Sequence, residues 1–147
     1  MRPLDDVDRD LTAELAADGR LSVNALADAV GVSRANAYRR LERLREEGVI
    51  RGFSVRLDHA ALGRPLAAVL LISIRQADWR AIQQRLLEIE EVDYLAATSG
   101  DFDFLALLRT ADAAELRDVV LERVHAIPGV VGTRTTFVLD EEVRRPF

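Results

Sequence analysis

The sequence predicts an α+β chain in which short helices come first and a unit of alternating strands and helices follows. In the first third, apolar residues recur every three or four positions, which is typical of amphipathic helices. After Pro65, apolar runs of strand length alternate with helical patterns. The stretch between them, residues 58–65, carries Gly63 and Pro65 and is predicted to be a linker. We therefore expect two domains, residues 1–57 and 66–147.

Three helices are expected in the first domain, each with a start and a stop signal. The expected N-caps are Asp5, Ser22 and Ser33, whose side-chain oxygens can accept hydrogen bonds from free backbone N–H groups. The expected stops are Gly19, Gly31 and Gly48. Residues Val49–Leu57 then tend to alternate apolar and polar side chains, which predicts a strand. We therefore expect this domain to be a winged helix-turn-helix.

The second domain is expected to follow the order βαββαβ. The predicted strands are Leu66–Ile74, Val92–Thr98, Phe102–Leu108 and Val130–Leu139. Asp78 and Asp112 are expected to begin its two helices. This order is that of a ferredoxin-like unit, in which the helices cover one face of an antiparallel sheet. The other face of the sheet needs a cover, so we expect a partner subunit.

The segment Leu26–Ser33 has the composition of a tight connection between two crossing helices. Ala27 is small enough for close helix packing, and Gly31 readily takes the left-handed backbone of a tight turn. Val32 is expected to fill the helix interface, and Ser33 to begin the next helix. A connection of three or four residues is the spacing of a DNA-reading helix-turn-helix.

On the helix after Ser33, polar and basic side chains form one outward stripe at about 100° per residue. The DNA-binding candidates are Ser33, Arg34, Asn36, Arg39, Arg40 and Arg43. Asn can pair with adenine and Arg with guanine, and Arg also binds phosphates. Those nearest the helix start are expected at the bases, whereas Arg40 and Arg43 are expected to hold the DNA backbone. The alternative is an ordinary solvated helix face.

The charge of the chain is unevenly divided, although its net value is −5. Residues 19–56 contain eight arginines and four acidic residues, a net charge of +4. Residues 65–147 contain nine arginines and fourteen acidic residues, a net charge of −5. A basic segment joined to an acidic one indicates that double-stranded DNA is contacted at one end only.

Polar groups in the second domain are candidates for a small-molecule site. Its candidate residues are Ser99, Gly100, Asp101, Asp103, Thr133 and Thr135. The turn at Gly100 leaves backbone N–H groups that could donate hydrogen bonds to a carboxylate, and Asp101 or Asp103 could bind an ammonium group. The two threonines alternate on one predicted strand and so share a face. Spacing alone favours an ordinary hairpin connection over such a site.

Several motifs, in order along nearly the whole chain, resemble the Lrp/AsnC, or feast/famine, transcription regulators. They are Leu4-Asp5-x-x-Asp8, Leu26-Ala27-x-x-Val30-Gly31-Val32-Ser33, Arg40-x-x-Arg43-Leu44-x-x-x-Gly48-Val49-Ile50-x-Gly52-Phe53, Ser99-Gly100-Asp101-Phe102-Asp103 and Pro128-Gly129-Val130 followed by Thr133-Arg134-Thr135. The resemblance implies homodimers that assemble into octamers or larger discs. It also implies an amino acid or related metabolite as effector, bound between dimers, with Ser99–Asp103 in that site.

Other classes of protein find little support in the sequence. The chain has no cysteine, and His59 and His125 lie far apart, so neither a metal site nor a cofactor is expected. No nucleophile–histidine pair or phosphate-binding glycine loop indicates an enzyme. Without a signal sequence or a membrane span, a cytoplasmic protein is expected. Two alternatives stay open: an architectural DNA-binding protein without an effector, and a metabolite-binding module that has lost DNA binding.

Overall fold

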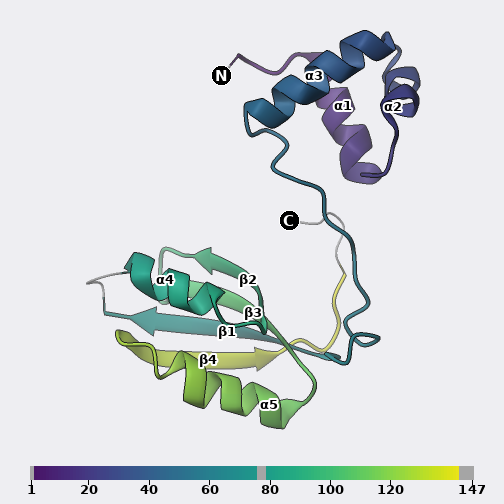
Figure 1. Ribbon diagram of the computed structural model, residues 1–147. Coiled ribbons are helices and arrows are strands. Elements are labelled where there is room, and N and C mark those ends of the chain that lie inside the picture. The colour runs from purple at the N-terminus through teal and green to yellow at the C-terminus, as the bar shows by residue number, and fades with distance from the viewer. Residues whose placement is uncertain (1, 76–78, 143–147) are drawn as a thin grey trace. The chain divides into compact units, whose positions relative to one another are not determined.

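The computed structural model describes residues 2–75 and 79–142, which divide between Arg56 and Leu57 into two compact units. The N-terminal unit contains helices α1 (Asp6–Ala17), α2 (Val23–Val30) and α3 (Arg34–Glu46) (Figure 1). The expected caps are confirmed, because the side chains of Asp5, Ser22 and Ser33 each accept a backbone hydrogen bond at a helix start. The apolar sides of the three helices meet in a small core of Leu11, Leu26, Ala27 and Ala37.

The strand predicted at Val49–Leu57 is wrong for this structure, in which these residues form no regular element. The apolar side chains of the segment are largely exposed: Phe53 at 55%, Val55 at 75% and Leu57 at 54%. A strand requires a neighbouring strand to take up its backbone hydrogen bonds. The alternating pattern is present, but no segment described in this chain pairs with it.

The C-terminal unit confirms the predicted βαββαβ order. Its strands are β1 (Leu66–Ile74), β2 (Val92–Ala97), β3 (Phe104–Thr110) and β4 (Val130–Phe137). Its helices are α4 (Trp79–Leu87) and α5 (Ala113–Asp118), the latter continuing as the π-helix η1 (Val119–Val124). Strand β3 begins two residues later than predicted. Asp112 caps α5 as expected, whereas the other expected cap, Asp78, lies outside the described residues.

All neighbouring strands are antiparallel in the order β2-β3-β1-β4, so β1 lies between β3 and β4 (Figure 1). One face of the sheet carries Leu70, Ile72 and Phe104, which are buried together with apolar residues of α4, α5 and η1. The opposite face carries Val69, Leu71, Leu105 and Leu107, which are only half-buried. This second face, the open face, has no helix over it within the described chain.

Candidate nucleic-acid interface and effector site

The connection between α2 and α3 has the expected helix-turn-helix geometry. Gly31 ends α2 with φ at +72°, in the left-handed region. The backbone N–H of Val32 donates to the carbonyl of Ala27 at 3.0 Å, and the hydroxyl of Ser33 accepts from the N–H of Asn36 at 3.3 Å. These contacts fix the direction in which α3 leaves the turn.

The predicted DNA-binding side chains of α3 divide into two groups. Arg34 and Arg39 are exposed, and no ion pair involves either of them within residues 2–75 and 79–142. Asn36 is half-buried, and its Oδ1 accepts a hydrogen bond from Nε of Arg40 at 3.0 Å. The first group is therefore available to a nucleic acid, while Asn36 has part of its hydrogen-bonding capacity in use.

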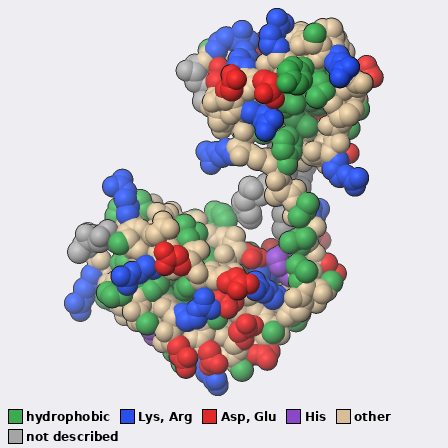
Figure 2. Space-filling view, viewed as in Figure 1, with side chains coloured by type: hydrophobic (Ala, Val, Ile, Leu, Met, Phe, Trp, Pro, Cys, Tyr) green, Lys and Arg blue, Asp and Glu red, His purple; other side chains and the backbone are tan. Residues whose placement is uncertain are grey.

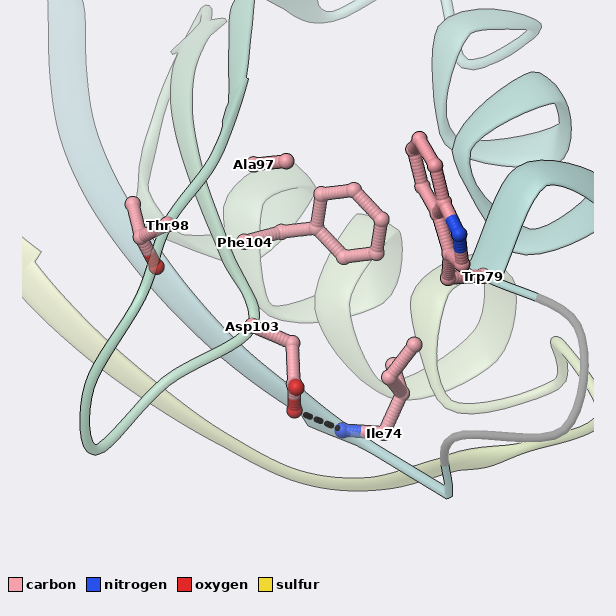
Figure 3. Close-up of a pocket in the computed structure, with 6 residues that line it drawn as sticks. All are labelled: Ile74, Trp79, Ala97, Thr98, Asp103 and Phe104. Carbon is pink, nitrogen blue, oxygen red and sulfur yellow. Dashed lines mark hydrogen bonds between the residues drawn. The ribbon is translucent and has the colours of Figure 1, made fainter.

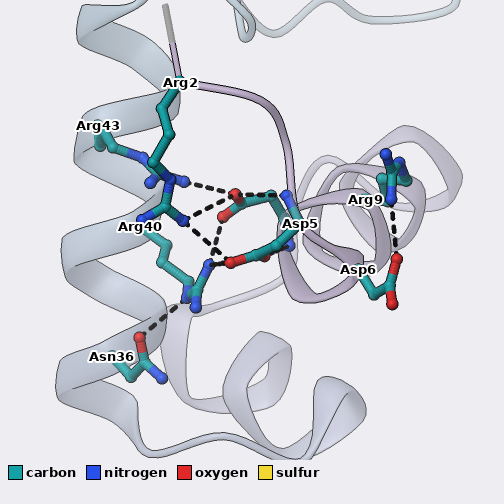
Figure 4. Close-up of polar contacts among 8 residues, drawn as sticks. Arg2, Asp5, Asp6, Arg9, Asn36, Arg40 and Arg43 are labelled. Atoms are coloured by element: carbon teal, nitrogen blue, oxygen red, sulfur yellow. Dashed lines mark hydrogen bonds and ion pairs between the residues drawn. The ribbon is translucent and has the colours of Figure 1, made fainter.

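Arg40 and Arg43 form ion pairs inside the N-terminal unit (Figure 4). Nη1 of Arg40 lies 2.7 Å from Oδ2 of Asp5 and 2.7 Å from Oδ1 of Asp8. Nη2 of Arg43 lies 2.6 Å from Oδ2 of Asp8. The sequence predicted both arginines at the DNA backbone, and the structure shows both paired with the carboxylates of Asp5 and Asp8 at the start of α1.

The two carboxylates are set by the first turn of α1. Asp5 and Asp8 form a capping box, in which each side chain accepts a hydrogen bond from the backbone N–H of the other residue. The hydrogen bond from Arg40 lowers the pKa of Asp5 to about 2. Burial opposes ionisation of Asp8, but hydrogen bonds from Arg40, the Asp5 backbone and Arg43 still lower its pKa. Both groups are therefore carboxylates at neutral pH.

A polar hollow of about 270 Å³ opens beside these pairs. Its lining residues are Arg2, Asn36, Arg39, Arg40 and Arg43. Figure 2 shows basic side chains spread over the N-terminal unit, whereas acidic side chains gather on the visible face of the C-terminal unit. A hollow lined by four guanidinium groups is suited to an anion such as a phosphate.

In the C-terminal unit, Asp103 is the predicted effector residue that lines a cavity. This cavity, of about 290 Å³, is bounded by Ile74, Trp79, Ala97, Thr98, Asp103 and Phe104 (Figure 3). Oδ2 of Asp103 accepts a hydrogen bond from the backbone N–H of Ile74 at 2.7 Å. Trp79 and Phe104 provide aromatic walls. Sequence reasoning assigned neither of them to the site, because an apolar pattern does not separate core from cavity lining.

The other effector candidates are not gathered at this cavity. Ser99, Gly100 and Asp101 are exposed in the connection between β2 and β3. Thr133 and Thr135 lie on β4, opposite Ile72 and Leu70 of β1, and the Thr133 hydroxyl lies 2.8 Å from Nε2 of His125. Within the described residues, Arg134 of β4 lies over the Phe102 ring at 5.3 Å, but no hydrogen bond or ion pair joins Thr133 or Thr135 to the Ser99–Asp103 connection.

No helix in residues 2–75 and 79–142 is long and apolar enough to cross a membrane. In the same ranges, no group of three or more histidine, aspartate or glutamate side chains is arranged to hold a metal ion.

Two known protein families match the chain, one over each unit. Residues 4–51 match the winged helix-turn-helix DNA-binding family, and residues 67–146 match the Lrp/AsnC ligand binding domain. The HTH-type transcriptional regulator LrpA of Mycobacterium tuberculosis is 36% identical over 93% of this chain and 91% of its own length. The leucine-responsive regulatory protein of Haemophilus influenzae is 34% identical over 95% of this chain and 86% of its own.

Solved structures of related regulators also match the chain along nearly its whole length. The crystal structure of the M. tuberculosis leucine response regulatory protein covers 94% of this chain and 94% of its own, with a TM-score of 0.82 and 36% identity. A transcriptional regulator from Neisseria meningitidis, solved as a complex with L-Met, covers 97% of this chain and 94% of its own, with a TM-score of 0.85 and 26% identity. The family consists of transcription regulators rather than enzymes. The chain belongs to the Lrp/AsnC family of DNA-binding transcription regulators.

Proposed function

We propose that α3 enters the major groove of a specific DNA site, with Arg34, Asn36 and Arg39 near the bases and Ser33 at the point of entry. This proposal rests on two exposed arginines beside the helix-turn-helix connection, Arg34 and Arg39, neither of which has an ion-pair partner among the described residues. Residues near the start of a recognition helix are the ones that reach base edges. In a homodimer the two α3 helices would meet successive major grooves, roughly 34–36 Å apart.

The test is binding of the full chain to labelled duplex from its own upstream region, measured by fluorescence anisotropy across a salt series. Wild-type binding is expected to be salt-sensitive and stronger than binding to random duplex. Arg39→Ala should weaken the specific complex and relax its base preference by about 1–3 kcal/mol. If Arg39→Ala and Arg34→Ala both bind like wild type, the assigned face is incorrect.

We propose further that an amino acid is the effector, held by the Ser99–Asp103 connection of one chain together with Thr133 and Thr135 of another. The match to the Lrp/AsnC ligand binding domain supports an effector, and the L-Met complex of the Neisseria regulator supports its class. Asp103 offers a carboxylate beside an apolar cavity, which suits an ammonium group next to a side chain. Among the described residues, the Thr133 hydroxyl contacts His125 and neither threonine bonds to the Ser99–Asp103 connection, which supports a site completed by a second subunit.

Assembly is part of the same proposal. The half-buried residues Val69, Leu71, Leu105 and Leu107 form an apolar patch on the open face, and we propose that a second copy covers it. Dimers would then join into octamers or similar discs around the effector sites. Since its target is chromosomal DNA, we propose that the protein works in the cytoplasm.

The effector is tested by measuring the melting temperature of the full chain with each of the twenty amino acids, since a ligand that binds the native state raises it. For a ligand that does so, Asp103→Asn should remove the shift while keeping an acceptor for Ile74 N–H. Glu122→Gln, which removes the same charge from the exposed surface of η1, outside the proposed site, should keep it. If no amino acid changes melting, DNA affinity or assembly, the chain is better described as an architectural DNA-binding protein.

A further inference from the structure

We propose that Asp5 and Asp8 withhold Arg40 and Arg43 from the DNA backbone, so that these carboxylates limit the non-specific affinity of the recognition helix. The inference rests on the proposed DNA-reading face of α3. Helical spacing places Arg40 and Arg43 on that face, but both arginines form ion pairs with carboxylates of the same chain.

The pairing is multiple rather than a single surface contact. Arg40 donates from Nη1 to both carboxylates, at 2.7–2.8 Å, and from Nε to Asn36 at 3.0 Å. Arg43 reaches the remaining oxygen of Asp8 at 2.6 Å. Only 20% of the Arg40 side chain and 25% of the Arg43 side chain is exposed. Hydrogen bonds between charged groups are stronger than neutral ones, so these guanidinium groups are held in place.

Asp8 makes this arrangement hard to open. Its side chain is fully buried, at 0% exposure, and its oxygens receive Arg40, Arg43 and the backbone N–H of Asp5. Drawing both arginines away toward a phosphate would leave a buried carboxylate without a cation, which is strongly unfavourable. A DNA phosphate must therefore approach a hollow in which three of the four arginines, Arg2, Arg40 and Arg43, already share the two carboxylates.

Arg34 and Arg39 provide the contrast on the same helix. They are exposed and have no carboxylate partner among the described residues, so each can replace a counterion on DNA. Each phosphate-neutralising cation contributes about 0.9 to the slope of log Kobs against log salt on duplex DNA. The slope measured with random duplex therefore reports how many arginines neutralise DNA phosphates. We expect Arg39 to contribute to this slope, and Arg40 and Arg43 not to contribute.

The experiment measures this slope for the full chain with random-sequence duplex. Asp5→Asn is the main variant, because asparagine is as good an N-cap as aspartate and the Asp5 side chain is 41% exposed. Its expected effect is a slope steeper by up to about 0.9, so that affinity falls up to about 3.5-fold more than in wild type between 50 and 200 mM salt. Asp8→Asn should act in the same direction, and the melting temperature reports whether it remains folded.

Asp6→Asn is the matched control. Asp6 lies in the same helical turn as Asp8 and pairs with Arg9 at 2.8 Å, on the side of α1 away from α3 (Figure 4). The Asp6→Asn substitution removes the same charge and releases Arg9, which lies away from the proposed DNA-reading face. The slope of log Kobs against log salt should stay at the wild-type value.

Two arginine substitutions complete the test. Arg39→Gln should reduce the slope by about 0.9, whereas Arg43→Gln, which leaves Arg40 on Asp8, should leave it unchanged. If Arg43→Gln lowers the slope as much as Arg39→Gln, or if folded Asp5→Asn and Asp8→Asn both match wild type, the inference is overturned. A slope that Arg39→Gln does not change would instead refute the proposed DNA-reading face.

Discussion

The polar groups of α3 and those around Asp103 are organised in opposite ways. In the N-terminal unit, side chains from α1 and α3 of one chain meet each other directly, as the contacts of Asp8 with Arg40 and Arg43 show. In the C-terminal unit, no hydrogen bond or ion pair among the described residues joins the Ser99–Asp103 connection to Thr133 or Thr135, although Arg134 between the two threonines lies over the Phe102 ring at 5.3 Å. One chain therefore builds its proposed DNA-reading surface unaided, whereas the proposed effector site draws on a second chain.

This difference has a functional meaning. A DNA-reading surface that is fixed within one chain keeps its geometry whatever the assembly state. An effector site that needs two chains couples the ligand to assembly, because a ligand can shift an equilibrium only by its differential affinity for the two states.

The largest expected effects come from the two separate cores. Phe104, at 1% exposure, belongs to the core of the C-terminal unit, and Leu26, at 0%, to that of the N-terminal unit. Phe104→Ala should lower the free energy of unfolding of its unit by about 3–5 kcal/mol, and Leu26→Ala that of its own by about 2–5 kcal/mol. Denaturant unfolding followed by Trp79 fluorescence reports on the C-terminal unit. If Leu26→Ala moves that transition as much as Phe104→Ala does, the units do not unfold separately.

The next effect concerns assembly through the open face. Leu107→Arg places a charge among apolar side chains that we propose a second copy buries, and it should weaken the homodimer at least about tenfold. Light scattering after size-exclusion chromatography measures the mass. Leu121→Arg is the control, because Leu121 is an exposed leucine of η1, which packs on the other face of the sheet. A Leu107→Arg protein with wild-type mass would show that the dimer forms elsewhere.

A smaller effect is expected at the helix-turn-helix connection. Gly31→Ala forces a side chain onto a residue with φ of +72°, which should destabilise the N-terminal unit by about 1–2 kcal/mol. A Cβ there would meet no atom within 4 Å, so the loss comes from the backbone alone. Gly52→Ala, also without near neighbours and at an ordinary φ, is the control and should change thermal unfolding little. An equal loss of stability in both variants would argue against the left-handed backbone at Gly31.

The smallest effect is a pH dependence confined to the N-terminal unit. The folded-state pKa of Asp5, about 2, is below its ordinary 3.8, so its stabilising contacts are complete above pH 3.8 and are lost as the pH falls toward 2. The groups facing it are Arg40, Arg2 and Asp8. Thermal unfolding followed by circular dichroism should show this loss in wild type and a shallower one in Asp5→Asn. Parallel acid profiles would remove Asp5 as the cause.

Local signals in the sequence account for most of the fold. The N-caps Asp5, Ser22 and Ser33 were predictable because a capping side chain bonds to N–H groups two or three residues away. The strands β1 and β3 were predictable from apolar runs of strand length, but such runs do not show which face the helices cover. The strand predicted at Val49–Leu57 failed for the converse reason, since alternation reports the shape of a segment and not the presence of a neighbour.

The candidate sites depended more on tertiary structure. The sequence alone determined that Arg40 and Arg43 lie on the same outward stripe of α3 as Asn36 and Arg39, because helical geometry fixes that arrangement. Only the tertiary structure decided which of these charges are free. Asp8 is more than thirty positions from both Arg40 and Arg43, and ion pairing depends on the distance and burial that folding creates, which no local pattern records.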